Sequence, residues 1–113
     1  MTPPASGRAA PPIPKTLWSP LGPLRVRVVK RLTPLVRGSV DFGHYDPKKR
    51  TIRILADLDP WVQWQTLRHE WFHALVFDHG FHQAFTEEQI EALCDLVGTA
   101  LVAEMRNTPL TAA

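Results

Sequence analysis

Residues 59–80 contain the signals for both the start and the end of one long helix. Asp59 and Pro60 are typical of a helix start, because aspartate accepts from the first free N–H groups and proline fits the first helical position. Gly80 is typical of a helix end, where the backbone becomes left-handed. We therefore predict a helix from Pro60 to about Asp78. Its packing face consists of large apolar residues, namely Trp61, Trp64, Leu67, Trp71 and Leu75.

Alternating apolar and polar residues upstream of this helix predict β-strands. The first alternation begins at Leu24, and its apolar positions are separated by arginines. Residues 39–55 alternate on both sides of the turn sequence DPKK, which predicts a β-hairpin. In the first strand, Leu24, Val26 and Val28 are expected to share one face. In the hairpin, one strand places Val40, Phe42 and His44 on one face, and the other places Ile52 and Ile54 on one face.

A second helix is predicted downstream. Thr86 and Gln89 have the spacing of a capping box, which opens a helix through roughly Met105. Its expected buried stripe is Ile90, Leu93, Val97 and Leu101. Strands followed by two helices indicate an α+β fold, with a small twisted sheet of about three strands packed on both helices.

Proline content suggests how the chain is organised. Eight of the eleven prolines precede residue 35, and residues 1–20 combine Pro, Ala, Ser and Gly. We expect this segment to be a disordered or extended arm, because such a composition buries little apolar surface. Residues 21–107 are expected to form one domain and residues 108–113 a flexible tail. A core of this size is one that a bound metal often stabilises.

Composition argues against several classes of partner. The net charge is only +2, and the basic clusters RVRVVKR and KKR are short, so nucleic-acid binding is not expected. No apolar run is long enough to cross a bilayer, and no membrane partner is expected. The single cysteine, Cys94, and an N-terminus without signal-peptide character favour a cytoplasmic protein.

Residues 69–73, HEWFH, have the pattern His-Glu-x-x-His. His69 and His73 project from the same helix face, within reach of one zinc ion. Glu70 is rotated by about 100° around the helix axis, where it can reach a zinc-bound water and act as its general base. An ordinary amphipathic helix could contain this pattern by chance. The separate apolar face, however, means that the histidines are not needed for the core.

A zinc hydrolase normally has a third protein ligand, and we predict Glu91. It lies beside the expected buried stripe, where an unpaired carboxylate would be costly. Asp95 is predicted to accept the outer N–H of a ligating histidine and so to orient its ring. Two acids on a solvated helix flank would give the same pattern. His79 is the alternative ligand, as in HExxHxxGxxH, although Val76 occupies the position where that pattern has glycine.

Three further residues are considered for a part in catalysis or metal binding. His44 and Tyr45, near the hairpin end, could stabilise an oxyanion, but surface positions explain them equally well. Cys94 could bind metal, although a buried small side chain is the simpler expectation.

The stretch TLRHEWFHALVFDHGFHQAFTEEQIEALCDLVGTAL resembles small gluzincin-like metallopeptidases of the ImmA/IrrE type and short bacteriophage zincins. GHYDPKKRTIRI is similar to the hairpin that precedes their active-site helix, so the resemblance covers roughly residues 38–105. It implies a zincin-like fold, with His69, His73 and Glu91 as zinc ligands and Glu70 as general base. This sequence differs from those families in two respects: the domain is short, and the interval between His73 and Glu91 is short.

Together, the residues and the resemblance predict a zinc-dependent metallopeptidase acting on a peptide or protein substrate. An extended substrate would pair with an edge of the sheet. The alternative is a non-catalytic, zinc-stabilised protein that binds a partner through its tryptophans and proline-rich segment.

Overall fold

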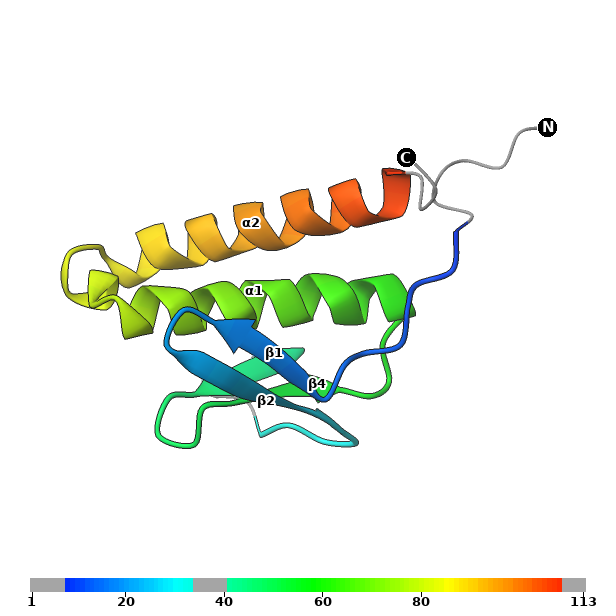
Figure 1. The fold of residues 1–113 in the computed structure, drawn as a ribbon, viewed down its shortest axis with the longest axis horizontal. Coiled ribbons are helices and arrows are strands. Elements are labelled where there is room, and N and C mark those ends of the chain that lie inside the picture. Colours follow the sequence, from blue (N-terminus) through cyan, green and yellow to red (C-terminus); the bar gives the residue numbers. More distant parts are fainter. Residues whose placement is uncertain (1–7, 34–40, 109–113) are drawn as a thin grey trace.

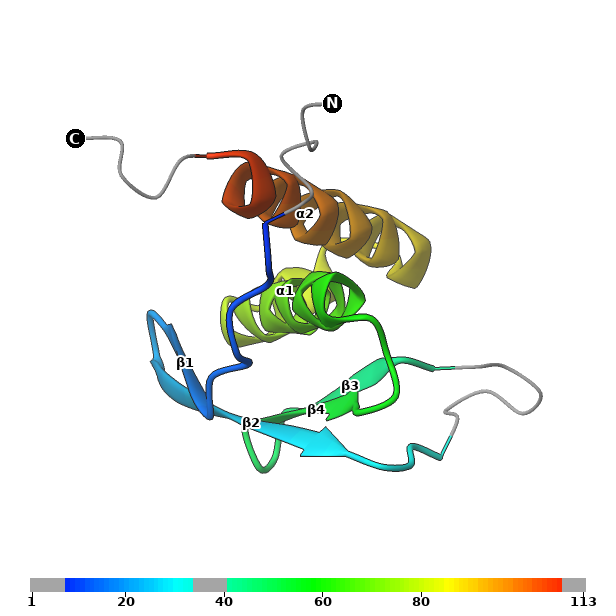
Figure 2. The ribbon, with the colours of Figure 1, turned by 90° about the vertical axis from the view of Figure 1, so that its right-hand side faces the viewer.

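A computed structural model describes residues 8–33 and 41–108, which form an α+β fold of three layers. A sheet forms the first layer, α1 the second, and α2 the third, on the side of α1 away from the sheet (Figure 1, Figure 2). In chain order the elements are β1 (Thr16–Ser19), β2 (Gly22–Val29), β3 (Gly43–Asp46), β4 (Thr51–Leu55), α1 (Pro60–Asp78), the short 3-10 helix η2 (Phe81–Gln83) and α2 (Glu87–Asn107).

The sheet has the strand order β1-β2-β4-β3 in the described part of the chain. β2 and β4 run parallel at its centre, and each has an antiparallel neighbour on its outer side. The expectation of about three strands is therefore too low, because β1 lies in a segment that was expected to be disordered. β3 is an edge strand and also contacts α1.

The predicted hairpin is confirmed for β3 and β4, while residues 39 and 40 lie outside the described residues. Its inward face differs from the expected one. Tyr45 is in register with the buried Ile52 and packs against the core, whereas His44 is in register with Arg53 on the outer face. Phe42 precedes the strand and is exposed. The short strand begins at Gly43, so the alternation read from Val40 does not continue through it.

The expectation of a disordered arm is wrong for residues 8–20. The indole N–H groups of Trp61 and Trp64 donate to the backbone oxygens of Arg8 and Pro11, at 3.0 and 2.7 Å. Proline-rich backbone lacks some N–H donors but keeps its carbonyls, and buried tryptophans require such acceptors. The apolar side chains of this segment, Ala10, Ile13 and Leu17, pack against the core.

α1 begins and ends where the sequence predicts. Asp59 accepts a hydrogen bond from the N–H of Trp61, and Gly80 has a positive φ of 75° just beyond the helix. The tryptophan face is buried against the inward side chains of the sheet; the largest residues of this shared core are Leu24, Ile52, Ile54, Trp61, Trp64 and Leu67. The histidine face of α1 is therefore left for contact with α2.

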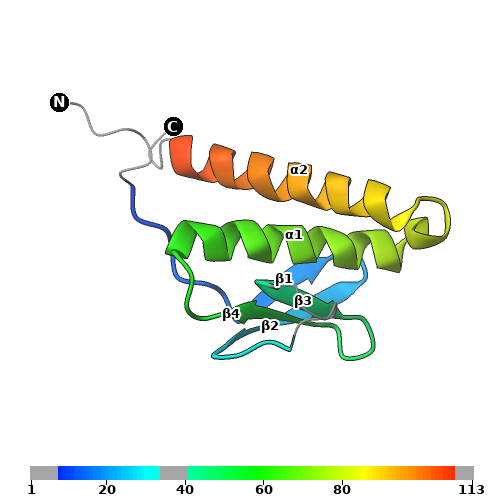
Figure 3. The ribbon, with the colours of Figure 1, turned by 180° about the vertical axis from the view of Figure 1, so that it is seen from behind.

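α2 has the predicted capping box, with Thr86 and Gln89 bonded reciprocally. Its buried stripe was predicted only in part, because the buried residues are Ile90, Cys94, Gly98 and Val102. Leu93 and Leu101 are exposed instead. The physical reason is that α2 packs on α1 and not on the sheet, so a narrow row at every fourth residue is enough (Figure 3).

Neither of the two long helices in the described residues combines the length and apolar character needed to cross a bilayer.

Candidate metal centre

The two histidines of the HExxH pattern lie on the face of α1 that is turned towards α2. Their ring centroids are 4.9 Å apart, as expected for residues one helical turn apart. Both rings border an open groove of about 860 Å³, which is lined by residues of α1, α2 and β3.

Glu91 of α2 contacts both histidines. Its Oε2 lies 3.3 Å from His69 Nε2, and its Oε1 lies 2.5 Å from His73 Nε2. Glu91 was expected to be buried, but its side chain is 56% exposed. Glu91 reaches the histidines from the rim of the groove.

Asp95 contacts the opposite nitrogen of His69. Its Oδ1 lies 2.8 Å from His69 Nδ1, so it can accept the proton of that nitrogen. A proton held on Nδ1 leaves the Nε2 lone pair free to bind a metal. Asp95 therefore occupies the position of a residue that orients a metal-binding histidine.

Cys94 is buried, as the sequence predicts, but its place beside both histidines was not predicted. It is fully buried, and its Sγ and one nitrogen each of His69 and His73 lie within 4.8 Å of one another, which makes a potential metal site. A second group within the same limit consists of His69, Glu91 and Asp95. Burial, reinforced by Glu91, Glu70 and Asp95, raises the pKa of the Cys94 thiol to about 12. Cys94 lies three residues, about one helical turn, after Glu91, and this spacing could have indicated from the sequence that Cys94 lies near the predicted metal ligands.

The groove concentrates negative charge. Among its described lining residues are the carboxylates Asp41, Glu70, Glu87, Glu91 and Asp95, but no lysine or arginine. Burial, with contributions from Glu91, Asp41 and Asp95, raises the pKa of Glu70 to about 8. A bound cation would favour the ionised carboxylates and so relieve this repulsion.

His73 is held in the form that binds metals. Its burial lowers the pKa of the imidazole, a change that His69 reinforces and Glu91 opposes. Because the ordinary value is 6.5, the ring is neutral at pH 7 and offers a lone pair.

His79 is not brought to this centre. It follows the last turn of α1, is exposed, and contacts the ring of Phe81 at 6.4 Å between centroids. It belongs to neither potential ligand group of the described residues. His44 bonds to Asp41 at 2.7 Å. Tyr45 is not a surface residue, and its hydroxyl is buried without a hydrogen-bond partner in the described structure.

Gly98 sets the distance between the two helices at this centre. A Cβ at this position would lie 2.9 Å from Gln65 O, 3.2 Å from His69 N and 3.4 Å from His69 Cβ. The first two of these atoms belong to the backbone of α1, which cannot yield as a flexible side chain would. A larger residue would therefore move α2, with Glu91 and Asp95, away from the histidines.

We expect Gly98→Ala to lower the free energy of unfolding by about 1–3 kcal/mol, the usual cost of overpacking. We also expect it to weaken zinc binding by about tenfold, or 1.4 kcal/mol. Calorimetric zinc titration and chemical denaturation measure these effects. The matched control is Ala100→Gly, which reports helix propensity alone at an exposed position of α2. If Gly98→Ala stabilises the protein and leaves zinc affinity unchanged, the close approach does not position the site.

No protein family, curated protein or solved structure was found to match this chain.

Proposed function

We propose that this protein is a zinc-dependent metallopeptidase in which His69, His73 and Glu91 hold the zinc and Glu70 is the general base. The observation that carries the proposal is the meeting of the two helices. The Nε2 atoms of both histidines lie within 3.3 Å of one carboxylate, and Asp95 binds the outer nitrogen of His69.

The donor set fits zinc. Two neutral imidazoles and a carboxylate are three protein ligands, which leaves a fourth position for water or substrate. The carboxylates of the groove, without a lysine or arginine in its described lining, supply the negative potential that a divalent cation requires.

Each residue of the centre has a separate role. Zinc, when bound, would polarise the peptide carbonyl and lower the pKa of the attacking water. Glu70 would accept the proton of that water and pass it to the leaving amide nitrogen. Its side chain is only 12% exposed and lines the groove, so bulk water does not compete strongly for the proton. Asp95 would keep His69 in the tautomer that presents Nε2.

The sheet offers a way to hold a peptide substrate. β3 is an edge strand, and its residues Gly43, His44 and Tyr45 line the same groove as the histidines. An extended peptide could add to this edge through backbone hydrogen bonds and cross the centre.

A second candidate function is a non-catalytic, zinc-stabilised interaction protein. Cys94 favours it, because a thiolate added to the two histidines and Glu91 would complete four protein ligands. Structural zinc sites are closed in this way, whereas catalytic sites keep an open position.

Cobalt substitution separates the two candidates. We expect wild-type protein to bind one equivalent of zinc or cobalt, and His69→Ala and His73→Ala to retain less than about a tenth of it. If Glu91 is the third ligand, the cobalt spectrum lacks a sulfur-to-cobalt charge-transfer band and Cys94→Ala leaves it unchanged. A band that disappears in Cys94→Ala would assign a closed site and contradict the peptidase proposal. Zinc retained by both histidine variants would contradict both candidates.

A further inference from the structure

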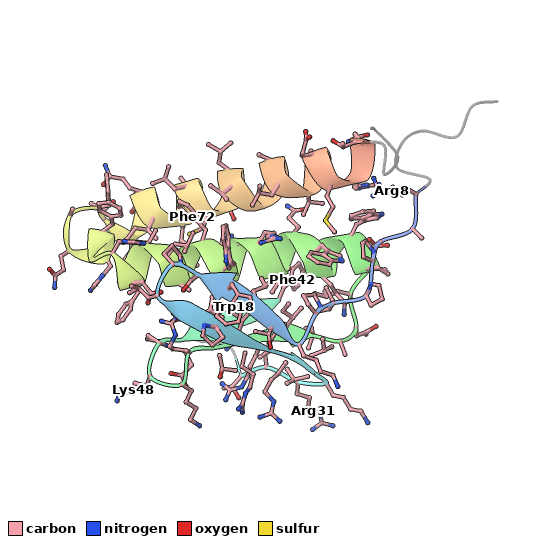
Figure 4. The ribbon with its side chains drawn as sticks, in the orientation of Figure 1. Arg8, Trp18, Arg31, Phe42, Lys48 and Phe72 are labelled. Carbon is pink, nitrogen blue, oxygen red and sulfur yellow. The ribbon has the colours of Figure 1, made fainter. Side chains whose placement is uncertain are left out.

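The outer face of the sheet, opposite the metal centre, carries basic residues of one sign. Strand alternation places Arg25 and Arg27 of β2 on this face, and Arg53 of β4 lies beside them. Arg27 and Arg53 are in direct register, and their pairing is parallel. Neither helix covers this side of the sheet, and nitrogen-tipped side chains project from it, Arg31 and Lys48 among them (Figure 4).

These cations lack counter-ions in the described residues. Arg25, Arg27 and Arg53 form no ion pair there, whereas Arg50 is bonded to Asp78. Nine of the eleven acids lie between Asp57 and Glu104, in α1, α2 and the loop before α1. Of the other two, Asp41 contacts His44, and Asp46 accepts N–H groups of its own turn.

Such a face is not explained by solvation alone. A solvated sheet face commonly mixes charges of both signs, and like charges in neighbouring cross-strand positions are destabilising. A groove of about 730 Å³ adjoins this face and shares Arg25 and Arg27 with it. Its charged lining residues are all cationic, namely Lys15, Arg25, Arg27, Lys49 and Arg50.

An exposed aromatic ring borders the basic residues. Trp18 of β1 is 70% exposed and in register with Pro23, so it lies on the same face as Arg25, two residues further along β2. Its backbone is held in place, because its carbonyl oxygen accepts a hydrogen bond from the indole of Trp71. An exposed indole on the same face as arginines is the combination that stacks a base while cations bind the backbone phosphates.

Overall charge gave no reason to expect nucleic-acid binding, but the fold gathers these cations on one face. We propose that the outer sheet face, defined by Trp18, Arg25, Arg27 and Arg53, binds single-stranded nucleic acid. The arginines contact phosphates and Trp18 stacks on a base. Phosphate contacts and base stacking do not distinguish DNA from RNA, so both are tested. The proposal is independent of the metal centre on the other side of the molecule, and binding persists in the presence of a zinc chelator.

Fluorescence anisotropy of labelled oligothymidine and oligouridine, between 50 and 200 mM salt, tests the proposal with the full chain. Three phosphate contacts predict a slope of log affinity against log salt of about −2. Arg27→Gln with Arg53→Gln is expected to weaken binding at least tenfold and to reduce the slope to about −1. Trp18→Ala is expected to weaken it at least fivefold. Binding of either oligonucleotide with these effects supports the proposal.

The matched control removes two arginines from the helical side of the molecule, Arg68→Gln with Arg106→Gln, and should change the affinity less than twofold. Thermal melting of each variant separates lost binding from lost folding. An equal loss in the control, or no binding at 50 mM salt, overturns the proposal. Polyglutamate that binds as tightly as the oligonucleotides also overturns it and assigns the face to an acidic protein partner.

Discussion

Replacing Glu70 with glutamine should lower peptide-bond cleavage by about 10²–10⁴-fold while leaving the metal in place, because general acid–base catalysis contributes about that factor. Glutamine keeps the size and hydrogen-bonding shape of the side chain but cannot take the proton of water. Glu70 is not among the proposed ligands, and its nearest contact with His69 Nε2 is 3.8 Å. Zinc content should therefore remain one per chain, as measured by elemental analysis.

The assay uses zinc-loaded protein with an unfolded, internally quenched fluorescent protein as substrate. Glu87→Gln is the matched control, because Glu87 lines the same groove from the first turn of α2 and has no proposed part in the reaction. It should change the rate by no more than a few-fold. If zinc-loaded wild type cleaves nothing, or Glu70→Gln cleaves as fast as wild type, the peptidase proposal is wrong.

Removing zinc should lower the free energy of unfolding by about 4 kcal/mol. The comparison is with protein at a free zinc concentration a thousand times the Kd. Each kcal/mol moves the Tm of a domain of about 100 residues by at least about 4 °C, so the expected fall in Tm is about 15 °C. The physical reason is that the proposed ligands come from both helices, and Glu91 and Asp95 concentrate negative charge that a cation offsets. Calorimetry with and without a chelator measures the change.

Glu91→Gln should lose at least half of this zinc-dependent stabilisation, because it removes the proposed charged ligand on α2. Glu88→Gln is its control, since Glu88 lies in the first turn of the same helix and outside the groove lining. A full zinc response in both Glu91→Gln and His73→Ala would show that the ion binds elsewhere in the protein.

The residues of the metal centre differ in how far the sequence could predict them. His69 and His73 share a helix, so their common face follows from a spacing of four. Glu91 and Asp95 lie on another helix. The sequence indicated Glu91 by its charge and by an expected burial that proved wrong, and Asp95 by its position four residues further on the same face; both side chains are exposed. Cys94 was expected to be a small buried side chain, with metal binding as the alternative. Its place beside both histidines depends on the close approach of α2 at Gly98, which no local pattern reveals.

Local sequence patterns were enough to predict the elements that depend on neighbouring residues: the limits of α1, the capping box of α2 and the β3–β4 hairpin. These follow from hydrogen bonds and side-chain spacing within a few residues. The packing of residues 8–19 on the core could not be predicted locally, because their carbonyls accept from tryptophans more than fifty positions away. The neighbouring positions of Arg27 and Arg53 also follow only from the folded structure, because a parallel pairing joins strands that are distant in sequence. Such contacts depend on the packing of the whole chain, which local spacing does not specify.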